Sequence, residues 1–144
     1  TNCNLIGYLV GDIVLDIHYE SNSLKRVFEN ERKLQQKCGK ERADLVKRRL
    51  YELHGAACLE ELRYLPGPRL HQHTRSKGQT KAVFTVDLDH PYRLLFEAGH
   101  DPEPELPGGG VDWTRVTRII IIGIEDPMDK YAFAPDYVVL PGKT

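Results

Sequence analysis

Residues 82–97, Ala-Val-Phe-Thr-Val-Asp-Leu-Asp-His-Pro-Tyr-Arg-Leu-Leu-Phe-Glu, decide the fold class. Apolar side chains recur at every second position from Ala82 to Leu88 and again from Tyr92 to Phe96, which is the period of a β-strand. The segment between the two runs, Asp89-His90-Pro91, has the composition of a turn. The stretch therefore predicts an antiparallel hairpin with one apolar face and one mixed face.

The segments on either side of this hairpin supply further strands. Residues 116–124 are almost wholly apolar and predict a central strand that is covered on both faces. Residues 12–18 predict a buried first strand, with apolar side chains at Ile13, Val14, Leu15 and Ile17. Between the hairpin and the central strand, prolines, glycines and acidic residues predict a long loop over residues 99–115.

Two helices are expected between the first strand and the hairpin. Apolar residues at helical spacing predict one helix over residues 24–38, with Gly39 at its end. A second helix is expected from about Glu41 to His54, and its apolar stripe consists of Ala43, Val46, Leu50 and Leu53. The short connection predicts a helical hairpin. A further short element is expected around residues 59–62.

This order of helices followed by strands predicts an α+β fold. We expect an N-terminal strand and a helical hairpin packed on a small, mainly antiparallel sheet. A chain of 144 residues is long enough for one domain with its own core. The expected core covers residues 12–126 of the single domain 1–144, with residues 1–11 and 130–144 as extensions.

Composition excludes several classes of protein. No apolar run approaches the ~20 residues of a membrane helix, so no membrane association is expected. The three cysteines, Cys3, Cys38 and Cys58, form no C-x-x-C pair, which argues against a cysteine zinc site. Reduced thiols and a cytoplasmic location are the expectation, and no cofactor is expected.

The formal net charge of −1 hides a segregation of charge along the chain. Residues 24–50 hold ten basic and four acidic residues, whereas residues 97–129 hold two basic and eight acidic ones. Basic helices with solvated faces are the simpler interpretation. The more specific interpretation is a basic surface that binds the phosphate backbone of a nucleic acid, with an acidic edge elsewhere on the protein.

The segment from residue 69 to 77 carries the candidate chemistry. In an extended strand, side chains two apart share a face, so Arg69, His71, His73 and Arg75 are expected to point the same way. Lys81 and Arg93 lie on the polar faces of the next two strands and are candidates to join them there. Histidine transfers protons near neutral pH, and fixed cations hold a phosphate and stabilise the charge that develops on it. The candidate phosphate-binding residues are Arg69, Arg75, Lys77 and Lys81, and the candidate catalytic residues are His71, His73 and Arg93.

Other interpretations of these residues stay open. His71 and His73 form an H-x-H pair, a common metal-ligand arrangement, although the neighbouring arginines argue against a bound cation. They also fit plain exposed strand residues. Tyr64 and Trp113 fit stacking on RNA bases, but packing in the core or at an interface is the favoured interpretation for both.

With these residues in view, the chain resembles the RelE/ParE superfamily of toxin–antitoxin toxins, and within it the HigB-like killer proteins. The resemblance runs over about residues 13–126 and rests on linked segments in a fixed order. These segments are 24–29, 49–59, 66–71, 82–86, 91–97 and 124–126. No single segment carries the resemblance, which rests on their order and spacing together; Pro66-Gly67-Pro68-Arg69-Leu70-His71 is one of them.

The resemblance implies a small α+β toxin that cleaves mRNA, usually on the ribosome, and that a co-encoded helix-turn-helix antitoxin neutralises. The family's Arg-Leu-His histidine corresponds to His71, and its basic residues to Arg75, Lys77, Lys81 and Arg93. Where many members have Asp-Tyr-His, this chain has Asp126-Pro127-Met128, and Tyr131 is the candidate substitute for the tyrosine. The missing Tyr-His pair gives weight to one alternative, a non-catalytic, ParE-like poison of DNA gyrase. A second alternative is a degenerate, non-toxic member that binds a partner.

Overall fold

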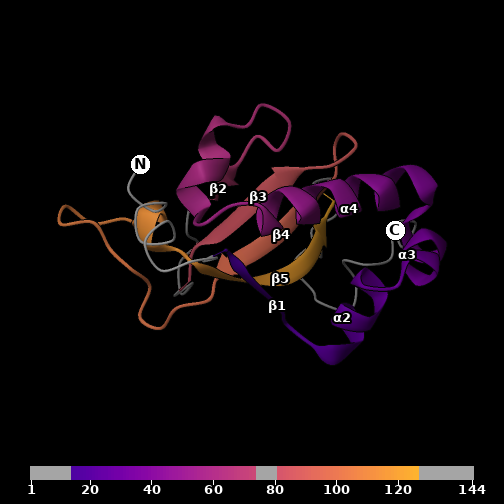
Figure 1. Ribbon diagram of the computed structural model, residues 1–144, viewed down its shortest axis with the longest axis horizontal. Coiled ribbons are helices and arrows are strands. Elements are labelled where there is room, and N and C mark those ends of the chain that lie inside the picture. Colours follow the sequence, from indigo (N-terminus) through magenta and orange to yellow (C-terminus); the bar gives the residue numbers. More distant parts are fainter. Residues whose placement is uncertain (1–13, 74–80, 127–144) are drawn as a thin grey trace.

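The computed structural model describes residues 14–73 and 81–126, which form an α+β fold (Figure 1). Its helices are α2 (Asn22–Phe28), α3 (Glu31–Cys38) and α4 (Lys40–His54), with 3-10 helices η1 (Leu59–Tyr64) and η2 (Trp113–Arg115). Its strands are β1 (Asp16–Tyr19), β2 (His71–Gln72), β3 (Val83–Asp87), β4 (Arg93–Ala98) and β5 (Arg118–Glu125). The expected fold class is confirmed.

The strands form one sheet in the order β1-β5-β4-β3-β2. Strands β3 and β4 pair as the expected antiparallel hairpin, and β5 lies inside the sheet between β4 and β1. Only the pairing of β1 with β5 is parallel, so the described sheet is mainly antiparallel, as predicted. A bulge between Leu95 and Phe96 shifts the register of β4 against β5.

The core lies between the sheet and the helices. Figure 1 shows α4 lying across one face of the sheet, with α2 and α3 to one side. The apolar stripe predicted for the second helix is buried at Ala43, Val46 and Leu53, while Leu50 is only partly buried. Phe84 and Phe96, opposite each other on β3 and β4, are fully buried and stack at 5.8 Å between ring centroids.

The helical segment predicted over residues 24–38 is two helices rather than one. Helix α2 ends at Phe28, and α3 begins after Asn30, whose side-chain oxygen accepts a hydrogen bond from the backbone N–H of Lys33 at 3.0 Å. An asparagine side chain that caps the following turn competes with continuation of the preceding helix. Gly39, at φ +82°, then joins α3 to α4 within one residue.

We expect Asn30→Ala to lower the free energy of unfolding by about 1 kcal/mol, because the first turn of α3 loses its cap. Urea denaturation followed by circular dichroism measures the change. Gln36→Ala, at an exposed position within α3, is the matched control and should leave stability unchanged within about 0.5 kcal/mol. Equal stabilities for the two variants would contradict the capping role of Asn30.

The boundaries of other predicted segments differ in detail. Within the described residues the first strand covers Asp16–Tyr19, against a prediction of 12–18, and Leu15 is buried just before it. The strand itself is exposed or half-buried, so the prediction of a buried strand is wrong. The loop over residues 99–115 contains an isolated bridge between Glu105 and Val111 and the helix η2. The extensions 1–11 and 130–144 lie outside the described residues, and the short element expected near residue 59 is η1.

The described residues also test the expectations for membranes and cysteines. No helix in residues 14–73 and 81–126 is long and apolar enough to cross a membrane. Cys38 is a buried free thiol, and burial raises its pKa to about 11, so it stays protonated at neutral pH. Cys58 is disulfide-bonded, so the expectation of reduced thiols is wrong for this residue.

Candidate functional site

The cross-strand pairs show which residues lie on which face of the sheet, because residues directly opposite each other on neighbouring strands point to the same side. Tyr19 packs on Phe28 of α2, with 5.9 Å between ring centroids, so its side of the sheet faces the helices. The pairs Tyr19–Ile121, Ile121–Phe96 and Phe96–Phe84 carry this face across the sheet. The alternate residues form the opposite side, which we call the open face after the exposed His71 at its β2 edge, although Thr85 and Leu95 at its centre are buried.

The open face holds most of the described candidate residues. On β2, His71 pairs with Thr85 of β3, which in turn pairs with Leu95 of β4. One step along the strands, Asp87 of β3 pairs with Arg93 of β4, and Arg93 pairs with Glu125 of β5. The period-two prediction that His71 and Arg93 share a face is therefore confirmed.

A hollow of about 370 Å³ lies at this end of the open face and is lined by Arg69, Leu70, His71, Asp87 and Arg93. We call it the Arg93 pocket. The Asp87 carboxylate lies between the two arginines, 3.5 Å from Nε of Arg69 and 3.5 Å from Nε of Arg93. Both separations exceed the 2.7–2.9 Å of a strong charge-assisted hydrogen bond, so the arginines keep donors for another anion. His71 is exposed beside them.

The backbone before β2 departs from the extended strand expected over residues 69–75. Arg69 has a φ of +49°, in the left-handed region, and β2 covers only His71 and Gln72. Arg69 therefore reaches the Arg93 pocket from a turn, with its side chain 77% exposed, and not from a strand. The single strand face proposed for the basic residues of this segment is wrong at Arg69.

Arg49 of α4 holds the backbone of Asp87, one of the residues that line the Arg93 pocket. Its Nε donates to the backbone carbonyl of Asp87 at 2.6 Å, and its Nη1 donates to Glu52 at 2.9 Å. A Cβ on Gly67 would lie 3.3 Å from Arg49 Nη1, so the turn before Arg69 packs closely on the guanidinium. Sequence analysis missed Arg49 and Asp87, although Arg49 is three residues after Val46 and four before Leu53 on the buried stripe.

A second arginine ties α4 to the turn between β3 and β4. The Arg42 guanidinium donates to both carboxylate oxygens of Asp89, at 2.9–3.2 Å, and lies 3.5 Å from the centre of the Tyr92 ring. Bidentate pairing and stacking of this kind restrain both partners. The hairpin that presents Asp87 and Arg93 is thus held at both ends of its turn.

His73 occupies a different environment from His71. Its Nε2 lies 3.3 Å from Glu125 Oε1, and Glu125 is only 7% exposed. The rings of His71 and His73 meet edge to face, with 5.7 Å between centroids. His71 is therefore the histidine that a ligand can reach directly, and His73 lies behind it against a buried carboxylate.

Lys81 lies apart from the Arg93 pocket. It precedes β3 by two residues, whereas Asp87 is the last residue of that strand, which separates them by roughly 20 Å at 3.3 Å per residue. Its electrostatic neighbour is Glu97: burial raises the pKa of this carboxyl, Lys81 lowers it in part, and Glu20 and Glu103 raise it further. Of the other candidates, Arg75, Lys77 and Tyr131 lie outside the described residues.

Thr85 has an unusual environment at the centre of the open face. It is fully buried, and its hydroxyl has no hydrogen-bond partner among residues 14–73 and 81–126. An unsatisfied buried hydroxyl costs free energy that an isosteric methyl group does not. We therefore expect Thr85→Val to raise the free energy of unfolding by about 1 kcal/mol, measured by urea denaturation.

Thr114→Val is the matched control for this substitution. The Thr114 hydroxyl donates to Asp112 at 2.6 Å, so its removal should lower stability by about 1 kcal/mol. Destabilisation by Thr85→Val as large as that by Thr114→Val would mean that the Thr85 hydroxyl has a partner in solution.

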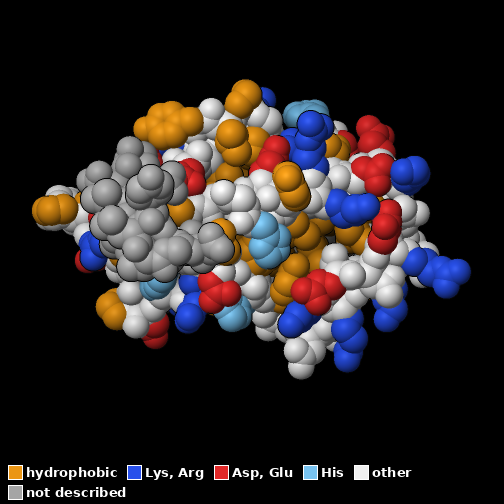
Figure 2. Space-filling model, in the orientation of Figure 1, with side chains coloured by type: hydrophobic (Ala, Val, Ile, Leu, Met, Phe, Trp, Pro, Cys, Tyr) orange, Lys and Arg blue, Asp and Glu red, His pale blue; other side chains and the backbone are white. Residues whose placement is uncertain are grey.

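The basic surface on the helices is smaller than the residue count suggests. Arg42 and Arg49 are engaged by the hairpin, and Lys40 and Lys47 pair with Asp44 and Glu31. The remaining cations of the segment are exposed and form no ion pair within the described residues: Lys25, Arg26, Arg32, Lys33, Lys37 and Arg48. Figure 2 shows Lys and Arg side chains gathered around the end of the molecule that α2 and α3 occupy, with acidic ones among them.

The two aromatic residues considered for base stacking differ. Trp113 packs against Phe84 at 5.7 Å and donates from its indole nitrogen to Gln72 at 3.0 Å, so the packing interpretation is confirmed for it. Tyr64 is instead exposed, with its hydroxyl 3.3 Å from Glu60. Packing in the core is therefore wrong for Tyr64 within the described part of the chain, while packing at an interface stays a prediction.

The metal interpretation of His71 and His73 finds no support within the described residues, where no group of three or more His, Cys, Asp or Glu side chains is placed to hold a metal ion. No protein family, no curated protein and no solved structure matches the chain. The site must therefore be interpreted from its own geometry.

Proposed function

We propose that this protein is an endoribonuclease that cleaves mRNA on the ribosome, as the toxin of a toxin–antitoxin pair. The observation that carries the proposal is the Arg93 pocket, in which an exposed histidine lies beside two arginines at the β2 edge of the sheet. RNA supplies both an anion for the arginines and its own nucleophile, the 2′-hydroxyl. Cleavage of RNA needs proton transfer and stabilisation of negative charge on the phosphate, which histidine and arginine side chains provide.

The proposed reaction is an in-line displacement at phosphorus. The 2′-oxygen forms a bond to phosphorus while the bond from phosphorus to the 5′-oxygen of the next nucleotide breaks. The 2′-hydroxyl proton passes to a base, and a proton is delivered to the leaving 5′-oxygen. We assign one of these transfers to His71 and stabilisation of the phosphorane charge to Arg93 and Arg69. The products carry a 2′,3′-cyclic phosphate and a 5′-hydroxyl.

The ribosome and the antitoxin are the proposed partners, as the resemblance to RelE/ParE toxins implies. The unpaired cations on α2, α3 and α4 support contact with ribosomal RNA, because clustered Lys and Arg side chains bind phosphate backbones through charge. These cations lie on the helices, and none of them lines the Arg93 pocket. In this proposal they dock the protein, while the open face acts on the message.

The test is cleavage of a defined mRNA in a reconstituted translation system. The full chain should cut the message only when ribosomes are translating it, and mapping of 5′ ends should place the cuts at preferred sites. The new 5′ ends should accept phosphate from a polynucleotide kinase without prior dephosphorylation, since they are hydroxyls. If the mRNA stays uncut under these conditions, the proposed endoribonuclease activity is wrong.

A second candidate function is favoured by the acids in the site. Asp87 lies between Arg69 and Arg93, and Glu125 lies against His73, so carboxylates balance the fixed cations of the cluster. This balance suits a binding surface without chemistry better than a strongly cationic active site. A ParE-like poison of DNA gyrase would inhibit supercoiling by purified gyrase and leave mRNA intact, whereas the endoribonuclease would do the reverse.

A further inference from the structure

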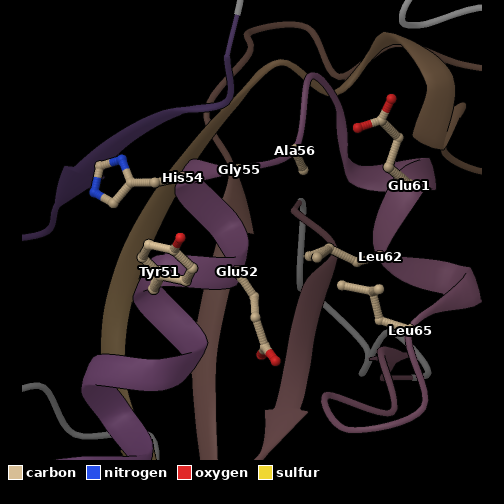
Figure 3. A pocket seen from close by; sticks show the side chains of 8 residues that line it. All are labelled: Tyr51, Glu52, His54, Gly55, Ala56, Glu61, Leu62 and Leu65. Atoms are coloured by element: carbon tan, nitrogen blue, oxygen red, sulfur yellow. The ribbon is translucent and has the colours of Figure 1, made fainter.

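Two acidic side chains line a hollow of about 460 Å³ between the end of α4 and η1 (Figure 3). Glu52 is paired there with Arg49 at 2.9 Å. Figure 3 shows the Glu61 carboxylate directed away from Leu62 and Leu65. Neither carboxylate is therefore placed to bind a ligand in this hollow. A buried carboxylate with a clearer role lies at the end of β5.

Glu125 is this buried carboxylate, and the proposed reaction does not use it. It is 7% exposed, and its Oε1 lies 3.3 Å from Nε2 of His73. Strands β4 and β3 lie between β5 and β2 in the sheet, so the contact crosses the open face. Because a buried carboxylate is costly without a donor, Glu125 favours the orientation in which the Nε2–H of His73 faces it.

The ring of His73 in turn contacts the ring of His71. The ring centroids are 5.7 Å apart and the rings are inclined at 82°, which is an edge-to-face arrangement. His71 is exposed and lines the Arg93 pocket, and within the described residues no hydrogen bond or ion pair holds its side chain. The contact with His73 therefore restricts the rotamers that are available to His71.

The geometry favours this supporting role of His73 over a second proton transfer. In an in-line displacement the attacking 2′-oxygen and the leaving 5′-oxygen lie on opposite sides of phosphorus, so the groups that serve them do as well. Two rings in edge-to-face contact leave no room for a phosphate between them. The side chain of His73 is also only 25% exposed, whereas His71 is open to solvent.

We propose that Glu125 and His73 are positioning residues for His71. Glu125 accepts a hydrogen bond from His73 and fixes the orientation of its ring. That ring then holds His71 in a rotamer that faces the phosphate bound in the Arg93 pocket. The inference rests on the proposed endoribonuclease function. An acid–base group that is already oriented speeds the chemical step, because less freedom of motion is lost on the way to the reactive geometry.

Steady-state cleavage of mRNA by the full chain, at varied concentrations of programmed ribosomes, tests this role. His73→Ala and Glu125→Leu should each lower kcat about tenfold and change KM by less than about twofold, because the arginines still bind the RNA. The double variant should lose no more than either single variant, since both changes remove the same support. Glu125→Gln keeps an acceptor for His73 and should restore most of the rate.

Asp16→Leu is the matched control, because Asp16 contacts His18 at 2.8 Å at the opposite edge of the sheet. Its kcat should equal that of the parent. A second measurement needs no RNA. In NMR spectra, the parent and Glu125→Gln should show nuclear Overhauser effects between the rings of His71 and His73, and Glu125→Leu should lose them.

Far-UV circular dichroism establishes that the variants are folded, and the double variant, which has no unpaired buried carboxylate, replaces His73→Ala if that protein does not fold. The positioning role is overturned if the parent cleaves mRNA and the variants keep its kcat, if KM rises while kcat is unchanged, or if Glu125→Gln loses as much rate as Glu125→Leu. If the parent leaves mRNA uncut, the proposed function is wrong. The NMR measurement then decides alone, and a ring contact that persists in Glu125→Leu overturns the role of Glu125.

Discussion

Substitution of His71 by alanine should reduce mRNA cleavage in the translation assay by about 10²- to 10⁴-fold, the contribution typical of one general acid–base group. His71 is the exposed histidine of the open face, and it lines the Arg93 pocket beside Arg69 and Arg93. No other histidine is among the described residues that line this pocket. The measurement is the initial rate of appearance of 5′-hydroxyl ends at a fixed concentration of programmed ribosomes.

His18→Ala is the matched control for this experiment. His18 is also an exposed histidine, but it lies on β1, at the opposite edge of the five-stranded sheet, where it contacts Asp16 at 2.8 Å. Its loss should leave the cleavage rate unchanged. The far-UV circular dichroism spectra of both variants should match the parent, since both side chains are exposed. Full activity of His71→Ala, or an equal loss in both variants, would sink the assignment of His71.

The parts of the fold that sequence predicted well are those fixed by local periodicity. Apolar side chains recur at every second residue in the hairpin of β3 and β4, and α4 has a continuous apolar stripe. The predicted ends of both therefore agree with the structure to within two residues. The break at Asn30 was missed because the apolar residues on either side of it remain in helical register. The capping hydrogen bond from Lys33 to Asn30 decides that break, and it has no effect on the apolar pattern.

The candidate site was predicted only in part, for a related reason. Strand periodicity placed His71 and Arg93 on one face, because it depends on residues within single strands. Asp87 and Arg49 were missed because their roles depend on contacts between segments far apart in the chain. Arg49 is one of the ten basic residues of the segment 24–50, yet its position on the buried stripe of α4 indicates that its side chain points inward.

Arg49→Met should lower the free energy of unfolding by about 3 kcal/mol. The substitution keeps the apolar stem but removes the donors to the Asp87 carbonyl and to Glu52, leaving a partly buried carboxylate without its cation. Urea denaturation followed by the fluorescence of Trp113, the chain's single tryptophan, measures the loss. Arg49→Lys should have an intermediate effect, because one ammonium group replaces the fork that reaches both acceptors.

The neighbouring Arg48→Met separates this specific role from a general loss of positive charge. Arg48 is exposed on the same helix and forms no ion pair within the described residues, so its replacement should change stability by no more than about 0.5 kcal/mol. If Arg49 also positions the Arg93 pocket, Arg49→Lys should lose more cleavage rate than its folded fraction accounts for, because the Asp87 backbone is no longer fixed. Equal stabilities of the two methionine variants would show that the contact between Arg49 and Asp87 contributes nothing in solution.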